Sequence, residues 1–110
     1  MEEQYIPIIS GSHAAKVKVG DIIMIERNRR KLHIITGHRE YQYYEKMENV
    51  ELLLDDRFYP CLKGCYINLE RISSMEDQRI FFDNGLVYDL GRENFIKTKQ
   101  KYRGYLRNTI

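Results

Sequence analysis

The residues best suited to chemistry in this sequence are cations, and they are clustered. From position 27 to position 39 there are five basic side chains and no acid, and positions 97 to 107 carry five more, again without an acid. The densest group is Arg27-Asn28-Arg29-Arg30-Lys31. Guanidinium groups donate parallel hydrogen bonds that match phosphate oxygens and the O6 and N7 atoms of guanine. The cluster therefore favours contact with nucleic acid, although composition alone also fits a solvated surface loop.

Two further cations stand beside glycines. Lys63 precedes Gly64, and Arg92 follows Gly91. Glycine marks turns, and a long cation on a turn tip projects from the scaffold. We therefore regard Lys63 and Arg92 as candidate contacts to phosphate or to a base edge.

The sequence gives little support for a metal site or an enzyme. Cys61 and Cys65 are separated by three residues, whereas structural zinc sites usually combine close cysteine pairs. The histidines are scattered along the chain at His13, His33 and His38. No G-x-S-x-G turn, phosphate-binding glycine loop or H-E-x-x-H helix is present. We expect free thiols, no metal, no cofactor and no catalytic residues.

Length and composition predict one globular domain over residues 1–110. The chain has 110 residues, of which 43% are hydrophobic and 31% charged, so it resembles neither a disordered tail nor a membrane protein. Its formal net charge of +2 is too small to identify a partner by itself. The start, Met1-Glu2-Glu3-Gln4, has no secretory signal, which predicts a cytoplasmic protein with reduced cysteines.

The first half of the chain reads mainly as strands. Pro7 makes the first of these an edge strand, because proline cannot donate to a ladder. The run Ile22–Glu26 is continuously apolar and is expected to be central. Arg27–Lys31 has no apolar residue and is expected to be a projecting loop. The other strands are expected at Tyr5–Ile9, Lys16–Val19, Leu32–Thr36 and Arg39–Tyr44.

The pattern of the second half predicts one internal helix, further strands and a C-terminal helix. Glu45–Leu54 has the apolar spacing of an amphipathic helix that covers a sheet. Phe58–Asn68 reads as strand, loop and strand, and the pair Arg79–Phe82 and Leu86–Asp89 as a hairpin with a type I′ turn at Asn84-Gly85. Phe95–Leu106 is ambiguous, and we expect a short strand or turn followed by a basic helix that ends near Arg107. The predicted fold class is mainly β, in small antiparallel sheets.

The order of several motifs resembles the LytTR (LytR/AgrA-type) DNA-binding domain of bacterial transcription regulators. Asp21-Ile22-Ile23-Met24-Ile25-Glu26 is similar to the family's "D-I-x-y-i-E" strand. The stretch from Asp55 to Asn68 is similar to "F-x-R-x-H-R-S-x-I-V-N", and Asn84-Gly85 followed by Leu90-Gly91-Arg92 is similar to "N-G…v-S-R". The resemblance covers about Val17 to Lys101. Two departures stand out: Leu62-Lys63-Gly64 replaces His-Arg-Ser, and Gly91 replaces the serine.

The resemblance implies about ten strands in small antiparallel sheets, with loops that enter successive major grooves and bend the duplex. Carried over by position, its DNA-binding residues fall in the loop after the apolar strand, at the second turn and after the last hairpin. They are Asn28, Arg29, Arg30, Lys31, His33, Lys63 and Arg92. Asn68 keeps the family's asparagine, but its place on a strand favours a backbone-bonding role.

These observations lead to one main hypothesis and two alternatives. We expect a stand-alone, cytoplasmic bacterial transcription regulator that binds double-stranded DNA, with a homodimer on repeated sites left open. The first alternative is a degenerate protein-interaction module that uses Tyr41, Tyr43 and Tyr44 as an aromatic surface. The second is single-stranded RNA binding through tyrosine stacking.

Overall fold

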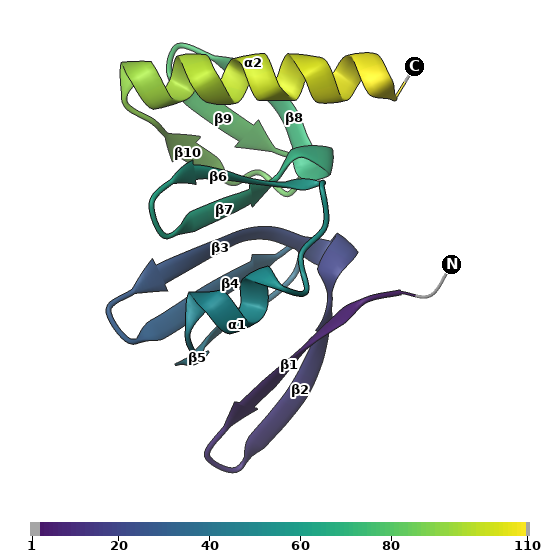
Figure 1. The fold of residues 1–110 in the computed structure, drawn as a ribbon, viewed down its shortest axis with the longest axis vertical. Coiled ribbons are helices and arrows are strands. Elements are labelled where there is room, and N and C mark those ends of the chain that lie inside the picture. Colours follow the sequence, from purple (N-terminus) through teal and green to yellow (C-terminus); the bar gives the residue numbers. More distant parts are fainter. Residues whose placement is uncertain (1–2, 110) are drawn as a thin grey trace.

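The computed structural model describes residues 3–109 and is mainly β, as predicted. Ten strands form three antiparallel sheets that follow one another along the longest axis of the molecule (Figure 1). A five-stranded sheet lies in the middle. A two-stranded hairpin lies below it in this view, and a three-stranded sheet covered by a long helix lies above.

The central sheet has the strand order β5-β4-β3-β7-β6. The apolar run predicted to be central is β3, and the residues from Ile22 to Ile25 are at most 1% exposed. This strand is covered on both faces, which explains why its sequence is continuously apolar. The five strands are β3 (Ile22–Asn28), β4 (Lys31–Thr36), β5 (Glu40–Tyr44), β6 (Phe58–Leu62) and β7 (Cys65–Asn68).

The two smaller sheets are simple antiparallel arrangements. Pro7 lies in β1, which pairs only with β2 among the described strands, so the predicted edge position is confirmed. Short 3-10 helices, η1 (Val19–Asp21) and η2 (Leu69–Arg71), link each hairpin to the next sheet. The strands are β1 (Tyr5–Ser10), β2 (His13–Lys18), β8 (Ile72–Glu76), β9 (Arg79–Phe82) and β10 (Val87–Asp89). The strand β8 was not predicted from the sequence.

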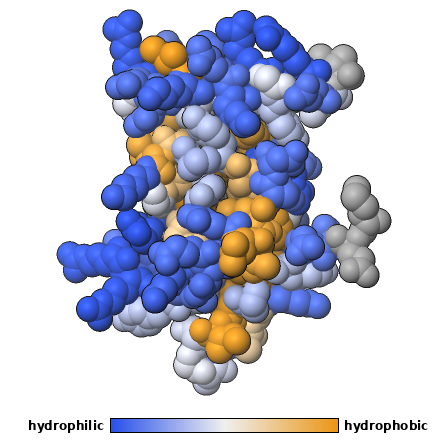
Figure 2. Space-filling model, viewed as in Figure 1, coloured by the Kyte–Doolittle hydropathy of each residue, from blue (hydrophilic) through white to orange (hydrophobic). Residues whose placement is uncertain are grey.

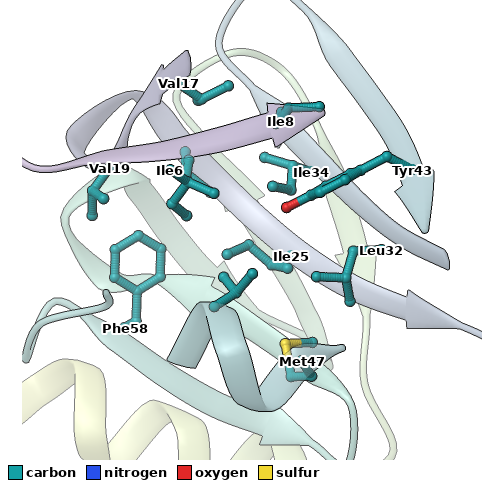
Figure 3. Close-up of a cluster of buried hydrophobic side chains, with 12 residues drawn as sticks. Ile6, Ile8, Val17, Val19, Ile25, Leu32, Ile34, Tyr43, Met47 and Phe58 are labelled. Atoms are coloured by element: carbon teal, nitrogen blue, oxygen red, sulfur yellow. The ribbon is translucent and has the colours of Figure 1, made fainter. Parts of the chain in front are cut away.

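Each face of the central sheet supports its own hydrophobic core. Figure 3 shows the first core, where Ile25, Leu32 and Ile34 of the sheet meet Ile6 of β1 and Met47. The second core lies on the opposite face and joins the central sheet to the three-stranded sheet and the C-terminal helix. Its members include Met24, Cys61, Cys65, Ile67, Ile80, Phe82, Leu90 and Phe95.

The internal helix is shorter than predicted. The prediction was Glu45–Leu54, but α1 spans only Met47–Glu51. Glu45 lies outside the helix, and its carboxylate accepts hydrogen bonds from the Lys46 amide and from Asn49. At the other end the backbone closes into tight turns, and Leu52 is 85% exposed, so its apolar side chain contributes nothing to the core.

The C-terminal helix is longer than predicted, and the expected short strand or turn is wrong. The helix α2 spans Arg92–Asn108 and begins directly after Gly91. Phe95, Thr98 and Tyr102 are buried at helical spacing, and the Tyr102 hydroxyl donates a 2.9 Å hydrogen bond to the Ile72 carbonyl. Packing against the sheet therefore fixes the helix, although its first residues have no apolar pattern.

The predicted type I′ turn at Asn84-Gly85 is also wrong. Gly85 has a φ of 94°, but Asn84 is not left-handed, and its side chain accepts a hydrogen bond from the Leu86 amide instead. The consecutive left-handed residues are Asp77 and Gln78, with φ of 52° and 63°, in the turn between β8 and β9. Asparagine and aspartate both tolerate this conformation, so the residue types alone did not locate the tight turn.

Candidate nucleic-acid interface

The first cationic element is the hairpin between β3 and β4. The sequence predicted a loop over Arg27–Lys31, but Arg27 and Asn28 continue β3 and Lys31 begins β4. Asn28 pairs with Lys31, so only Arg29 and Arg30 lie in the turn. Arg29 has a φ of 60°, a left-handed conformation that is costly for a residue with a Cβ atom. Residues 27–31 are all exposed.

The second element, the turn between β6 and β7, lies directly beside the first. The Arg27 amide donates a 2.7 Å hydrogen bond to the Gly64 carbonyl, and the Arg27 side chain lies over Gly64. Gly64 has a φ of 77°, which accounts for glycine at this position. Lys63, at the same turn, is exposed.

The third element is the start of α2. Arg92 is the first residue of the helix and is exposed. Leu90, two residues earlier, is buried in the same core as Cys65 at the start of β7, so the turn and the helix start share one packing unit. The neighbouring acid, Glu93, forms an ion pair with Lys97 at 3.5 Å. Arg92 itself has no ion-pair partner among residues 3–109.

The three elements lie one above another along the left side of the molecule in Figure 1. In the same view, Figure 2 shows hydrophilic side chains projecting beyond this side. None of its cations forms an ion pair within the described chain. We call this surface the cationic edge and define it by Arg27, Asn28, Arg29, Arg30, Lys31, Lys63 and Arg92. The longest dimension of the molecule is 42 Å, which exceeds the roughly 34 Å of one duplex turn.

Comparison with known proteins decides the family. The family model of the LytTR DNA-binding domain matches residues 12–103. The chain belongs to this family. A search of curated proteins returned no match. A solved structure described as the LytTr DNA-binding domain of a methyl-accepting/DNA response regulator from Bacillus cereus has a TM-score of 0.74 and 15% sequence identity. The alignment covers 94% of this chain and 99% of that one, and it shows the same fold.

His33 differs from the other predicted residues of this LytTR domain. Its side chain is half-buried on β4, and its Nε2 atom lies 3.0 Å from a carboxylate oxygen of Glu40. Its ring is therefore held within the sheet, away from the turn tip. Lys31 remains accessible, and its ammonium group lies 5.1 Å from the ring centre of Tyr44, a side chain that is 70% exposed.

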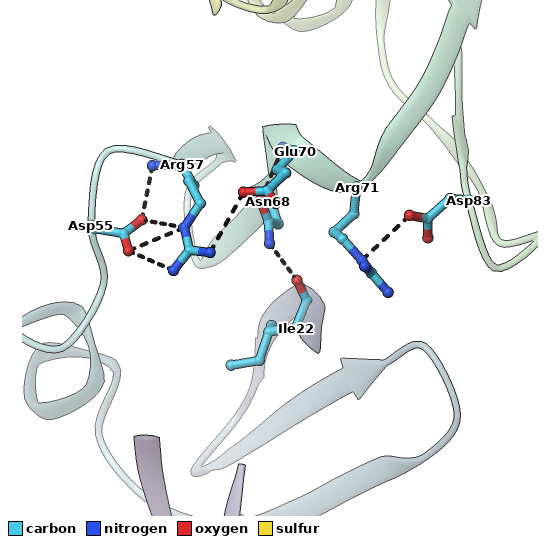
Figure 4. Close-up of polar contacts among 7 residues, drawn as sticks. All are labelled: Ile22, Asp55, Arg57, Asn68, Glu70, Arg71 and Asp83. Atoms are coloured by element: carbon cyan, nitrogen blue, oxygen red, sulfur yellow. Dashed lines mark hydrogen bonds and ion pairs between the residues drawn. The ribbon is translucent and has the colours of Figure 1, made fainter. Parts of the chain in front are cut away.

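A polar cluster at the end of β7 opposite the cationic edge holds Asn68, the asparagine of the motif that resembles the family's (Figure 4). Asn68 is fully buried; its amide donates a 2.8 Å hydrogen bond to the Ile22 carbonyl and its oxygen accepts one from the Glu70 amide. These bonds tie η2 to the start of β3. The prediction that Asn68 serves the backbone is therefore confirmed.

A second part of this cluster joins the α1–β6 connection to η2. Arg57 binds the Asp55 carboxylate, with a shortest contact of 2.7 Å, and lies 3.5 Å from Glu70. The hydrogen bonds from the Arg57 side chain lower the pKa of Asp55 below its ordinary value, against the opposing effect of partial burial. The cluster thus fixes the entry to β6.

The structure adds two residues that the sequence analysis did not place in the site. Arg27 belonged to the noticed basic run, but only its contact with Gly64 shows that it joins two turns. Tyr44 comes to the edge because it pairs directly with Lys31 across β4 and β5. The alternation in Glu40–Tyr44 was the available signal, since it places Tyr44 on the exposed face opposite Tyr43.

Two further observations concern other kinds of site. Within residues 3–109, no three histidine, cysteine or acidic side chains are grouped so that they could hold a metal ion. The described helices include none with the length and hydropathy needed to cross a bilayer.

Proposed function

We propose that this LytTR domain regulates transcription by binding duplex DNA through the cationic edge, with its turns inserted into successive major grooves. The observation that carries the proposal is the alignment, on one side, of three elements whose exposed cations form no ion pair within residues 3–109. Cations that are not neutralised within the protein are available to phosphates, and family membership points to DNA as the source of those phosphates.

The three elements suggest different roles. Arg92 stands at a helix start and carries a guanidinium fork, so we assign it to a guanine edge. Lys63 has a compact charge and no fork, so we assign it to a phosphate. Arg29 and Arg30 project from a two-residue turn, a shape narrow enough to enter a groove about 12 Å wide.

The aromatic alternatives are not favoured. The protein-interaction module required a surface of Tyr41, Tyr43 and Tyr44, and RNA binding required accessible tyrosines, but Tyr43 is only 2% exposed and packs in the first core, and Tyr41 is half-buried against it. Among these three tyrosines, only Tyr44 is exposed. A single accessible ring does not make a platform for stacked bases or an aromatic protein interface.

The test is selection from a random duplex library, followed by affinity measurements on the selected site and on a scrambled duplex. Arg92→Ala should cost about 1–3 kcal/mol on the selected site and relax preference at one base pair. Lys63→Ala should lower the affinity for both duplexes equally. It should also reduce the slope of log affinity against log salt by about 0.9. Unchanged affinity in both variants would refute the assigned contacts.

Two copies side by side on repeated sites remain a prediction. Light scattering of the complex on the selected duplex, with one half-site or two, measures the number of chains bound. A single chain on a two-site duplex at saturation would contradict it.

A further inference from the structure

The two cysteines of the chain lie in contact directly behind the β6–β7 turn. Their sulfur atoms are 3.7 Å apart, and each residue is 4% exposed. The contact arises from a bulge in the pairing of β6 with β7, where the register shifts between Pro60 and Leu62. As a result, Cys61 and Leu62 both lie opposite Cys65, and the two thiols point to the same side.

This pair lies where two elements of the cationic edge meet. Of the three residues between the cysteines, Leu62 ends β6, and Lys63 and Gly64 form the turn. Tyr88 on β10 packs against the same hydrophobic core as Cys65, and β10 leads into Arg92. A change in the bonding of Cys65 would therefore act on both the turn and the start of α2.

The two thiols are chemically unequal. The Cys61 thiol donates to the Cys65 sulfur, and this hydrogen bond lowers the pKa of Cys65 despite burial. The same contact, together with burial, raises the pKa of Cys61. Thiolates attack and thiols do not, so the hydrogen bond donated by Cys61 favours Cys65 as the attacking sulfur and Cys61 as the resolving one.

We propose that Cys61 and Cys65 are a modification site, a dithiol that hydrogen peroxide oxidises to an intramolecular disulfide, and that this disulfide weakens DNA binding at the cationic edge. The second half of the proposal rests on the proposed function. In the first step the Cys65 thiolate attacks one peroxide oxygen, the O–O bond breaks, and protonation of the leaving oxygen gives water and a sulfenic acid. In the second, the Cys61 sulfur attacks the sulfenic sulfur, the S–O bond breaks, and a second water leaves. Each sulfur is oxidised by one electron, and the peroxide accepts both.

The expected effect on DNA follows from geometry. A disulfide requires the sulfurs, which lie 3.7 Å apart, to approach to about 2.05 Å, and Lys63 lies in the turn between the two cysteines. Closing this gap shifts Lys63, and loss of one charge-assisted contact corresponds to about a tenfold rise in Kd.

The test uses the full chain and hydrogen peroxide, with two separate measurements. Reduced and peroxide-treated protein are unfolded, alkylated and weighed by mass spectrometry. We expect two alkyl groups on the reduced chain and none on the oxidised monomer, with reversal by dithiothreitol. Two alkylatable thiols after treatment, higher sulfur oxides, or a disulfide only between chains would overturn the modification site.

The second measurement is affinity for a fluorescent mixed-sequence duplex at low salt, before and after oxidation. A disulfide that forms without changing Kd overturns its coupling to DNA. Failure of the reduced protein to bind the duplex overturns the proposed function and this coupling, whereas the mass result still decides the modification site. Cys61→Ala and Cys65→Ala are matched controls: each should bind like the reduced chain and lose the peroxide effect on Kd.

Discussion

At Arg29, whose backbone is left-handed, two substitutions can separate an effect on DNA affinity from an effect on folding stability. Arg29 is exposed, has a φ of 60°, and forms no ion pair within the described chain. A left-handed residue with a Cβ atom costs about 1–2 kcal/mol. Arg29→Ala retains this cost, and Arg29→Gly removes it, while both delete the charge.

The two variants should therefore differ in stability but bind DNA equally. Glycine loses about 0.4–1 kcal/mol more than alanine through the entropy of the unfolded chain, so the net advantage of glycine is about 0.5–1 kcal/mol. For a domain of this size that difference corresponds to a Tm higher by about 2–4 °C. If Arg29 contacts one phosphate, both variants reduce the salt slope by about 0.9.

Thermal unfolding followed by circular dichroism gives the first quantity, and fluorescence anisotropy at several salt concentrations gives the second. Lys101→Ala is the matched charge control, because Lys101 is an exposed cation beside Asp56 and Leu69, outside the cationic edge. It should leave the slope unchanged. The reasoning is refuted if the alanine variant melts at or above the glycine variant, or if Lys101→Ala lowers the slope as much as Arg29→Ala.

The remaining predictions concern the frame that holds the edge. Asn68→Ala leaves a buried carbonyl at the start of β3 without its partner, so urea unfolding should show a loss of about 2–4 kcal/mol. Tyr102→Phe removes the hydroxyl bonded to the Ile72 carbonyl and should cost about 1–2 kcal/mol by the same assay. The pKa of Asp55 is lowered in the folded state by hydrogen bonds from Arg57, so this contact stabilises the fold above the unfolded pKa and is lost as pH falls through the folded value. The urea midpoint of Asp55→Asn should therefore lie below that of the unmodified chain at pH 7 and approach it in acid; an equal gap at both pH values would contradict this assignment.

Strands with strong apolar patterns could be predicted from the sequence, and weakly patterned elements could not. The run Ile22–Ile25 shows its central position because both faces of β3 are buried. By contrast, β8 carries one buried residue, Ile72, and its serines are exposed, so it lacks the alternation of a half-buried strand. The first turn of α2 has no capping side chain and no apolar residue before Phe95. The start of the helix at Arg92 could therefore not be predicted from the sequence.

The candidate site was predictable in its residue types but not in its arrangement. Charge and glycine positions indicated Arg29, Arg30, Lys63 and Arg92 from the sequence. Their placement on one side depends on the order β4-β3-β7-β6, a pairing between strands far apart in the chain. The contact of Cys61 with Cys65 was hidden for a related reason, because a bulge changes which side chains share a face.

Because the turns are short, DNA binding has a smaller cost in backbone conformational entropy. A free loop over residues 27–31 would have to order its backbone on binding, at about 1–2 kcal/mol for each residue. In the structure Arg27, Asn28 and Lys31 are already fixed by pairing in the central sheet, which avoids on the order of 3–6 kcal/mol of ordering. Two cores on opposite faces of that sheet hold the strands from which the turns project. If all three elements contact one duplex as proposed, any deformation needed to reach them falls mainly on the DNA, so sites that bend easily should bind more tightly even at base pairs the protein does not touch.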